Sequence, residues 1–112
     1  MAEFEAIRYE TAGRVARLTL NRPDHMNGMT NRMGREICQA LEAAAVDDRI
    51  SVLVLTGAGA AFCPGAELHH FTSGGADERL TPNEFQATAL LHEMPAVTIA
   101  AINGACAGAG LG

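Results

Sequence analysis

Two segments of the chain share a layout that places backbone N–H groups where a negative charge can develop. Leu53–Leu68 and Thr98–Gly112 each combine an apolar strand-like run, a glycine-rich turn and the expected start of a helix. The first turn of a helix has unpaired N–H groups and carries a partial positive charge. Two such ends that converge on one point would provide a pair of donors to an oxyanion.

Side chains near these turns offer other chemistry, and each also has a plainer structural interpretation. Cys63 is a nucleophile by type, but no base is beside it in the sequence, so a packing role is favoured. His69 and His70 can titrate near neutral pH, although a surface or packing role is favoured for them as well. A nucleotide-binding loop is disfavoured at Gly57–Ala60, because the P-loop lysine and the complete GxGxxG are missing.

The composition excludes several classes of function. A chain of 112 residues allows one small domain, and its apolar fraction of 48% excludes a disordered chain. The net charge is −5 and the eight basic residues are scattered arginines, so nucleic acid is not expected as a partner. No apolar run reaches the roughly 20 residues of a membrane span, and no signal peptide is expected at Met1–Phe4.

The three cysteines are widely spaced, and no CxxC or Cys/His cluster has the spacing of a metal site. We therefore expect no metal, and reduced thiols in a cytoplasmic protein.

Hydrophobic periodicity predicts the elements that position the two glycine-rich turns. Four strands are expected, at residues 4–9, 14–20, 51–56 and 96–102. The first two form a hairpin around a turn at 11–13, and the last two are typical of strands buried on both faces.

Two helices and a final turn complete the expected order. One helix is capped by Thr30 and runs to about Val46, and another is capped by Thr81 and ends at Glu93 or Met94. Residues 103–112 are expected to turn sharply and then begin a helix that faces a ligand.

Three motifs in this chain resemble the signatures of the crotonase (enoyl-CoA hydratase/isomerase) superfamily, in the family's order and spacing. They are Leu18–Pro23 with Asn27, Val52–Gly57 with Ala61–Leu68, and Pro95–Gly104 with Ala107–Gly110. The resemblance implies an α/β, crotonase-like (ClpP/crotonase) spiral of ββα units that is incomplete in this chain. Residues 1–112 would then be the N-terminal portion of a truncated crotonase-like domain.

The resemblance also implies a site. The substrate would be an acyl-CoA thioester, with no covalently bound cofactor, and the backbone N–H groups of Ala66 and Ala109 would form a catalytic oxyanion hole. The implied substrate-binding residues are Arg22, Met26, Asn27, Gly28, Gly65, Leu68 and Gly108. For Arg22, contact with a CoA phosphate and a simple solvated side chain remain open alternatives. Glu67 stands where the family has an aspartate with a structural role.

One departure from the family pattern bears on the reaction. Hydratases of the family use two glutamates as acid and base; the first aligns with Gly112, and the second is expected beyond it. General acid–base catalysis needs a titratable group within hydrogen-bond reach. Isomerisation, or another non-hydratase branch, is therefore favoured over hydration.

The alternative to a working enzyme is a catalytically inactive fragment that binds acyl-CoA or oligomerises. For the full-length protein, the resemblance implies a homotrimer or hexamer.

Overall fold

The computed structural model describes residues 4–63 and 89–106 of the chain. Its elements in chain order are β1 (Ile7–Ala12), β2 (Val15–Leu20), the 3-10 helix η1 (Pro23–His25), α1 (Asn31–Ala45), β3 (Val52–Gly57), β4 (Ala61–Cys63), β5 (Val97–Ala100) and β6 (Ala105–Cys106). The predicted order of strand, strand, helix and strand is confirmed. Residues 89–93 are also helical, as predicted for the second helix, whose proposed cap Thr81 lies outside the described residues.

The first two strands form the predicted antiparallel hairpin. β1 and β2 pair from Ile7 opposite Leu20 to Ala12 opposite Val15. The turn is tighter than the predicted turn at 11–13, because the first two of those residues still belong to β1. It uses Gly13 at a φ of 59°, a conformation that glycine adopts without steric cost.

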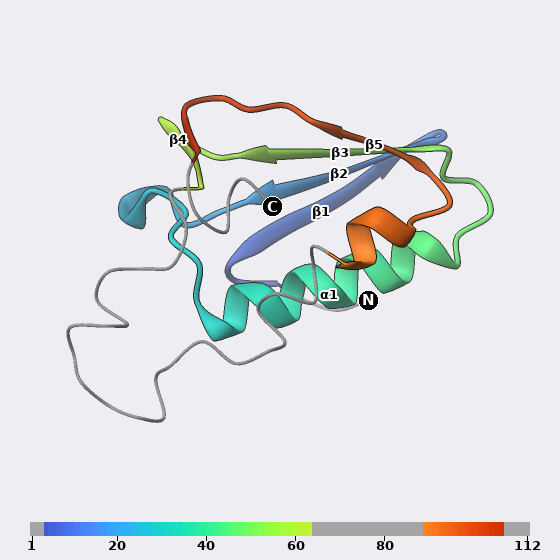
Figure 1. Cartoon of the computed structure of the whole chain (residues 1–112), viewed down its shortest axis with the longest axis horizontal. Helices are drawn as coiled ribbons and strands as arrows, with labels where there is room; N and C mark the ends of the chain where they lie inside the picture. The colour runs from blue at the N-terminus through green and yellow to red at the C-terminus, as the bar shows by residue number, and fades with distance from the viewer. Residues whose placement is uncertain (1–3, 64–88, 107–112) are drawn as a thin grey trace.

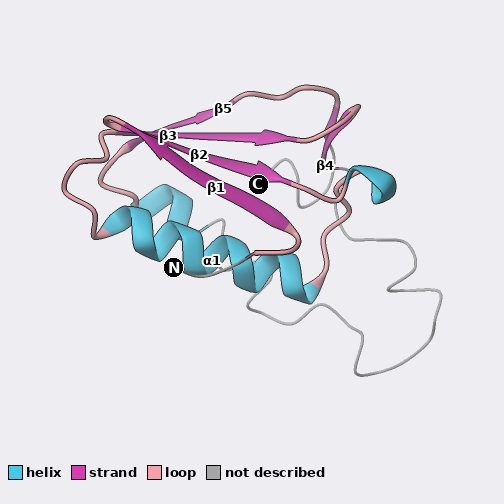
Figure 2. Ribbon diagram, turned by 180° about the vertical axis from the view of Figure 1, so that it is seen from behind, coloured by secondary structure: helices cyan, strands magenta, loops and turns pink. Residues whose placement is uncertain are grey.

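Helix α1 connects β2 to β3, and these two strands pair in parallel. The predicted cap is confirmed: Thr30 accepts a hydrogen bond from the N–H of Met33 at 3.2 Å. Figures 1 and 2 show α1 lying along one face of the sheet. The core between them is formed by apolar residues of both layers, among them Ile7, Ala16, Leu18, Leu20, Met33, Ile37, Ala40, Leu41 and Leu53.

The four-stranded sheet has the order β1-β2-β3-β5, so β5 is at its edge. A strand was expected at 96–102 and is confirmed over a shorter range, but the prediction that it is buried is wrong. Every residue of β5 is exposed, including Val97 (64%) and Ile99 (49%). The reason is positional, because α1 packs against β1 and β2 and, among the described elements, only β3 pairs with β5.

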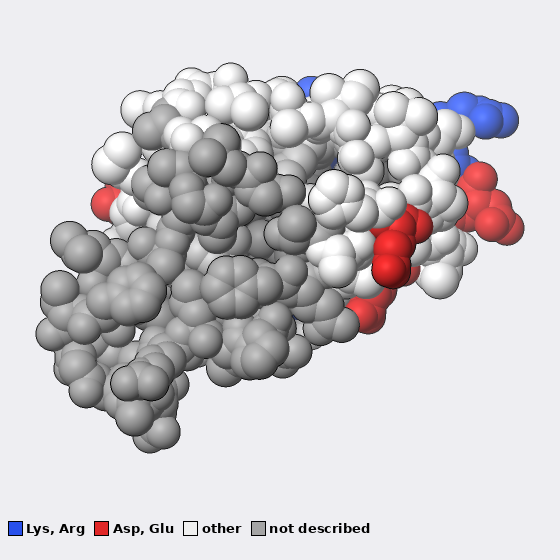
Figure 3. Space-filling view, viewed as in Figure 1, with Lys and Arg blue, Asp and Glu red and all other residues white. Residues whose placement is uncertain are grey.

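Strand β3 is also less buried than predicted. Leu53 is fully buried, whereas the other five residues of β3 are half-buried, because α1 covers only one face of the sheet. The upper edge of the molecule in Figure 3, where β5 and the next segment run in Figure 1, is mostly uncharged. Ile102, just beyond β5 in the sequence, is a third exposed apolar side chain.

A second, two-stranded sheet follows the first. β4 runs across the direction of β3 in both views, and it pairs in parallel with β6. The prediction of a turn followed directly by a helix at 103–112 is wrong at Ala105–Cys106, which form a strand, and residues 107–112 lie outside the described part. Within the described residues, no helix is long and apolar enough to cross a membrane.

Candidate functional site

A buried asparagine fixes the loop that leads from β3 to β4. Asn27 is completely buried and has a left-handed φ of 60°, which asparagine tolerates better than most residues. Its Oδ1 accepts from the N–H of Arg22 at 2.7 Å. Its Nδ2 donates to the carbonyls of Ala58 at 2.9 Å and Ala61 at 2.8 Å. These contacts satisfy both ends of the amide inside the protein, so the side chain positions backbone here.

A second asparagine holds the same loop from the other side. Asn103 accepts from the N–H of Gly57 at 3.1 Å and donates through Nδ2 to the carbonyl of Gly59 at 2.9 Å and to that of Ala61 at 3.2 Å. This role was not predicted from the sequence. The available signal was the Asn-Gly pair at 103–104, which is typical of a turn.

Two glycines allow these segments to come together. A Cβ at Gly57 would lie 2.7 Å from the carbonyl oxygen of Ala61 and 2.8 Å from Nδ2 of Asn27. A Cβ at Gly104 would overlap the carbonyl oxygen of Ala60. Neither position has room for a side chain, so glycine sets the close approach of the backbones around the start of β4.

The strands β4 and β6, which precede the two predicted donor positions in the sequence, pair with each other. Their register makes Cys63 and Cys106 direct partners. In the sequence, Ala66 follows Cys63 by three positions and Ala109 follows Cys106 by three positions. Both alanines lie outside the described residues, so their N–H groups stay a prediction.

The structure places three further predicted residues around η1. Arg22 is half-buried and donates to the carbonyl of Gly28 at 2.7 Å, while Gly28 itself is buried. Met26 is 52% exposed and has a φ of 54°. A hollow of about 290 Å³ beside Arg22 is also lined by Thr30, Arg32 and Glu5, and Arg32 pairs with Glu5 at 3.1 Å. The guanidinium group of Arg22 is suited to an anionic group such as a phosphate, whereas the charge of Arg32 is balanced by Glu5.

The other predicted site residues lie outside the described residues. They are Gly65, Leu68 and Gly108, together with Glu67, His69, His70 and Gly112, which were considered for catalytic roles. Across residues 4–63 and 89–106, no group of three or more His, Cys, Asp or Glu side chains could hold a metal ion.

A buried carboxylate that the sequence analysis missed ties the beginning of β1 to α1. Oε1 of Glu36 accepts from the N–H groups of Glu5 at 3.0 Å and Ala6 at 2.7 Å, and Oε2 accepts from Nε of Arg32 at 2.9 Å. Burial raises the pKa of Glu36, but the hydrogen bonds from Arg32, Ala6 and Glu5 outweigh it, and the pKa is lowered from its ordinary value. In the sequence, the only sign of this contact is that Glu36 lies on the face of the helix that carries the buried apolar residues.

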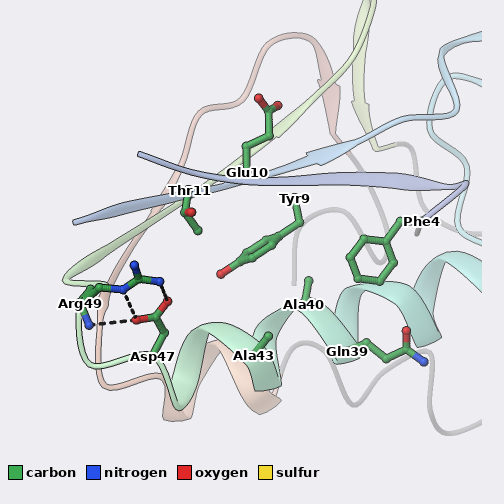
Figure 4. Close-up of a pocket in the computed structure, with 9 residues that line it drawn as sticks. All are labelled: Phe4, Tyr9, Glu10, Thr11, Gln39, Ala40, Ala43, Asp47 and Arg49. Carbon is green, nitrogen blue, oxygen red and sulfur yellow. Dashed lines mark hydrogen bonds and ion pairs between the residues drawn. The ribbon is translucent and has the colours of Figure 1, made fainter. Parts of the chain in front are cut away.

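A separate cavity of about 580 Å³ lies between β1 and α1, and none of the predicted site residues lines it (Figure 4). Tyr9 and Phe4 face it from the strand side, and an ion pair at 3.1 Å joins Arg49 to Asp47 at one end. Burial raises the pKa of Tyr9, and the negative charge of Asp47 raises it further. Among the described residues that line this cavity, none is a proposed oxyanion donor or a predicted substrate-binding residue.

Comparison with known sequences finds the same family as the motifs indicated. The sequence model of the enoyl-CoA hydratase/isomerase family matches residues 10–112. The chain is 37% identical to a probable enoyl-CoA hydratase, EchA14, of Mycobacterium tuberculosis, over 99% of this chain and 44% of that protein. It is 35% identical to the 1,2-epoxyphenylacetyl-CoA isomerase of Escherichia coli, over 86% of this chain and 39% of that enzyme.

Solved structures show the same relationship. An enoyl-CoA hydratase/isomerase from Xanthobacter autotrophicus Py2 matches with a TM-score of 0.84 at 32% identity, over 96% of this chain and 42% of that one. DspI of Pseudomonas aeruginosa matches with a TM-score of 0.86 at 32% identity, over 99% and 43%. The chain thus spans less than half of each of these relatives, and the predicted α/β crotonase fold is confirmed as an incomplete one. The chain belongs to the enoyl-CoA hydratase/isomerase family.

Proposed function

We propose that residues 1–112 are the N-terminal portion of an enzyme that processes acyl-CoA thioesters and stabilises a thioester enolate. The stabilising groups are the backbone N–H donors of Ala66 and Ala109. The observation that carries the proposal is the parallel pairing of β4 with β6, because each donor position follows a paired residue, Cys63 or Cys106, by three positions. Removal of one oxyanion donor typically costs about 2.7–4 kcal/mol of transition-state stabilisation. Catalysis would therefore need both donors to be close enough to bind the same oxygen.

Isomerisation, or another non-hydratase branch, is the favoured reaction. Gly112 stands where the first glutamate of the hydratases is expected, and glycine cannot transfer a proton through a side chain. Relatives of this chain bear both kinds of name, including 2,3-dehydroadipyl-CoA hydratase and 1,2-epoxyphenylacetyl-CoA isomerase of Escherichia coli. Family membership therefore allows either hydration or isomerisation, and Gly112 is the residue that favours isomerisation or another non-hydratase branch.

The CoA moiety would lie against the segment around η1. Arg22 is the candidate for a CoA phosphate, supported by its guanidinium group beside a hollow that Thr30, Arg32 and Glu5 also line. Met26 would border the ligand through its exposed side chain, next to the buried Gly28, and Gly65, Leu68 and Gly108 would lie near the thioester. Asn27 would contribute by holding this turn against the carbonyls of Ala58 and Ala61, because its side chain is buried.

The second candidate is a catalytically inactive acyl-CoA-binding or oligomerising fragment. The observation that favours it is the exposed apolar edge formed by Val97, Ile99 and Ile102, in a chain that spans less than half of its relatives. Contiguous exposed apolar surface commonly marks an interaction site. For the full-length protein we propose a cytoplasmic homotrimer or hexamer, to be checked by light scattering coupled to size-exclusion chromatography.

A titration of the purified chain with crotonyl-CoA separates these candidates. Binding with thermal stabilisation but no turnover favours the catalytically inactive acyl-CoA binder over the enzyme. Complete absence of binding overturns both CoA proposals for this chain, and robust hydration overturns the interpretation of Gly112.

Replacement of one proposed donor tests the oxyanion hole itself. Ala109→Pro removes the N–H, whereas Ala109→Gly keeps it and serves as the matched control. Turnover of an acyl-CoA substrate by the full-length protein should fall about 10²–10³-fold in the proline variant alone. Equal turnover of both variants, with unchanged circular dichroism spectra, would contradict the assignment.

A further inference from the structure

Two thiols are neighbours across the second sheet. Cys63 and Cys106 are direct partners in the parallel register of β4 and β6. In a regular sheet adjacent strands lie about 4.8 Å apart, and a disulfide spans about 4.4–6.8 Å between Cα atoms. Cys63 belongs to the buried apolar cluster, and Cys106 packs against that same cluster. We propose that Cys63 and Cys106 are a dithiol pair that is reversibly oxidised to a disulfide.

The two cysteines differ in exposure, and this difference assigns their order of reaction. Cys63 is only 1% exposed, whereas Cys106 is partly exposed, and both are reduced in the structure. Cys106 is therefore the residue that meets a dissolved oxidant first, and Cys63 is the resolving thiol. Such a division between an accessible thiol and a neighbouring resolving thiol is the usual arrangement of a redox-sensitive pair.

The oxidant that we propose is a low-molecular-weight disulfide such as oxidised glutathione. The thiolate of Cys106 attacks one sulfur of that disulfide, a mixed disulfide forms, and one glutathione thiolate leaves. The thiolate of Cys63 then attacks the Cys106 sulfur of the mixed disulfide and releases the second glutathione. The protein loses two protons and two electrons, which together are two hydrogen atoms, and the oxidant gains them as two glutathione thiols.

The backbone next to the two cysteines is suited to the small shift that a disulfide between them would need. The register of β4 and β6 is irregular between Ala61 and Cys63, where two steps on one strand match one step on the other. A bulge of this kind interrupts the regular ladder, so a small shift there does not break a continuous set of hydrogen bonds. Because Ala66 and Ala109 follow the two cysteines, the disulfide would fix the separation of the strands that lead to them; this consequence rests on the proposed function.

Mass spectrometry of the oxidised chain tests the pair without reference to any activity. The reduced protein is incubated with oxidised glutathione, the oxidant is removed, and remaining thiols are alkylated after denaturation. We expect the number of alkylated cysteines to fall from three to one, with the loss of two hydrogens and a linked peptide pair containing Cys63 and Cys106. Three alkylated thiols after oxidation, or a link that involves Cys38, would overturn the proposal.

Single substitutions supply the matched controls. Cys38 lies on α1 rather than on either strand, so Cys38→Ser should leave the loss of two hydrogens unchanged. Cys63→Ser should instead leave a stable glutathione adduct on Cys106, because the resolving thiol is missing. Absence of that adduct, with an adduct on Cys38, would contradict the assigned order of attack. The linked peptide in the unsubstituted chain keeps the test decisive even where a variant does not fold.

Discussion

Asn27 and Asn103 donate to the same acceptor, the carbonyl oxygen of Ala61, at 2.8 and 3.2 Å. One amide comes from the segment before α1 and the other from the segment after β5, so the start of β4 is held from both sides. The two donors differ in burial, because Asn27 is completely buried whereas Asn103 is exposed. The position of β4 therefore depends on contacts between residues that are distant in the sequence.

Replacement of Asn27 by alanine should destabilise the chain by at least about 2 kcal/mol, because the N–H of Arg22 and the carbonyl of Ala58 lose this partner and each such loss costs about 1–3 kcal/mol, whereas the carbonyl of Ala61 keeps Asn103. Urea denaturation measures this change in the free energy of unfolding. Asn27→Gly should be nearly as damaging, since relief of the left-handed φ does not restore the hydrogen bonds. The control is Asn21→Ala, where a surface contact with Arg8 is lost and a change within about 0.5 kcal/mol is expected.

A double-mutant cycle between Asn27 and Asn103 should show coupling of at least about 0.5 kcal/mol, the lower end for residues that share a partner. In each single variant the carbonyl of Ala61 keeps one amide donor, and in the double variant it loses both. The double variant should thus be less stable than the sum of the single changes predicts. Strict additivity would show that the two amides act on the loop independently.

The sequence predicted those features that depend on short-range patterns. Thr30 was identified as a cap because its hydroxyl needs only the N–H of Met33, three residues away. The hairpin and α1 followed from periodicity for the same reason, since neighbouring residues alone determine which face is apolar. The family resemblance also rested on contiguous motifs, and the match over residues 10–112 confirms it.

Features that depend on distant neighbours were not predicted. An apolar run such as Val97–Ala100 has the composition of a buried strand, but its exposure follows from its place at the sheet edge, which local composition does not encode. The roles of Asn103 and Glu36 likewise depend on partners more than 29 positions away. A polar residue in an apolar pattern shows that a partner is needed, but not which one.

Loss of the Glu36 carboxylate should change how stability depends on pH. The folded-state pKa of Glu36 is lowered, so its contribution is fully present above the ordinary glutamate pKa and is lost as pH falls through the folded-state value. Glu36→Gln should cost about 2 kcal/mol at neutral pH, because charged hydrogen bonds to Glu5, Ala6 and Arg32 are weakened or lost. Urea denaturation at a series of pH values below neutrality measures both effects.

The acid-dependent part of the unfolding free energy should be smaller in the Glu36→Gln variant than in the unsubstituted chain. Glu42 is an exposed residue of the same helix, so Glu42→Gln is the matched control for removal of a carboxylate from α1. A profile that is identical in all three proteins would mean that Glu36 does not titrate differently in the folded and unfolded states.

Substitution of Gly104 by alanine should destabilise the chain by about 2 kcal/mol or more, because the new Cβ would overlap the carbonyl oxygen of Ala60. That carbonyl cannot move cheaply, since Asn103 binds the carbonyls of Gly59 and Ala61 on either side of it. Gly13 is the matched control: its φ is 59° and nothing lies within 4 Å of an added Cβ, so Gly13→Ala should cost only the backbone strain of about 1 kcal/mol. A smaller loss at Gly104 than at Gly13, measured by urea denaturation, would show that the loop from Gly57 to Ala61 adjusts freely and that Asn27 and Asn103 do not hold it in place.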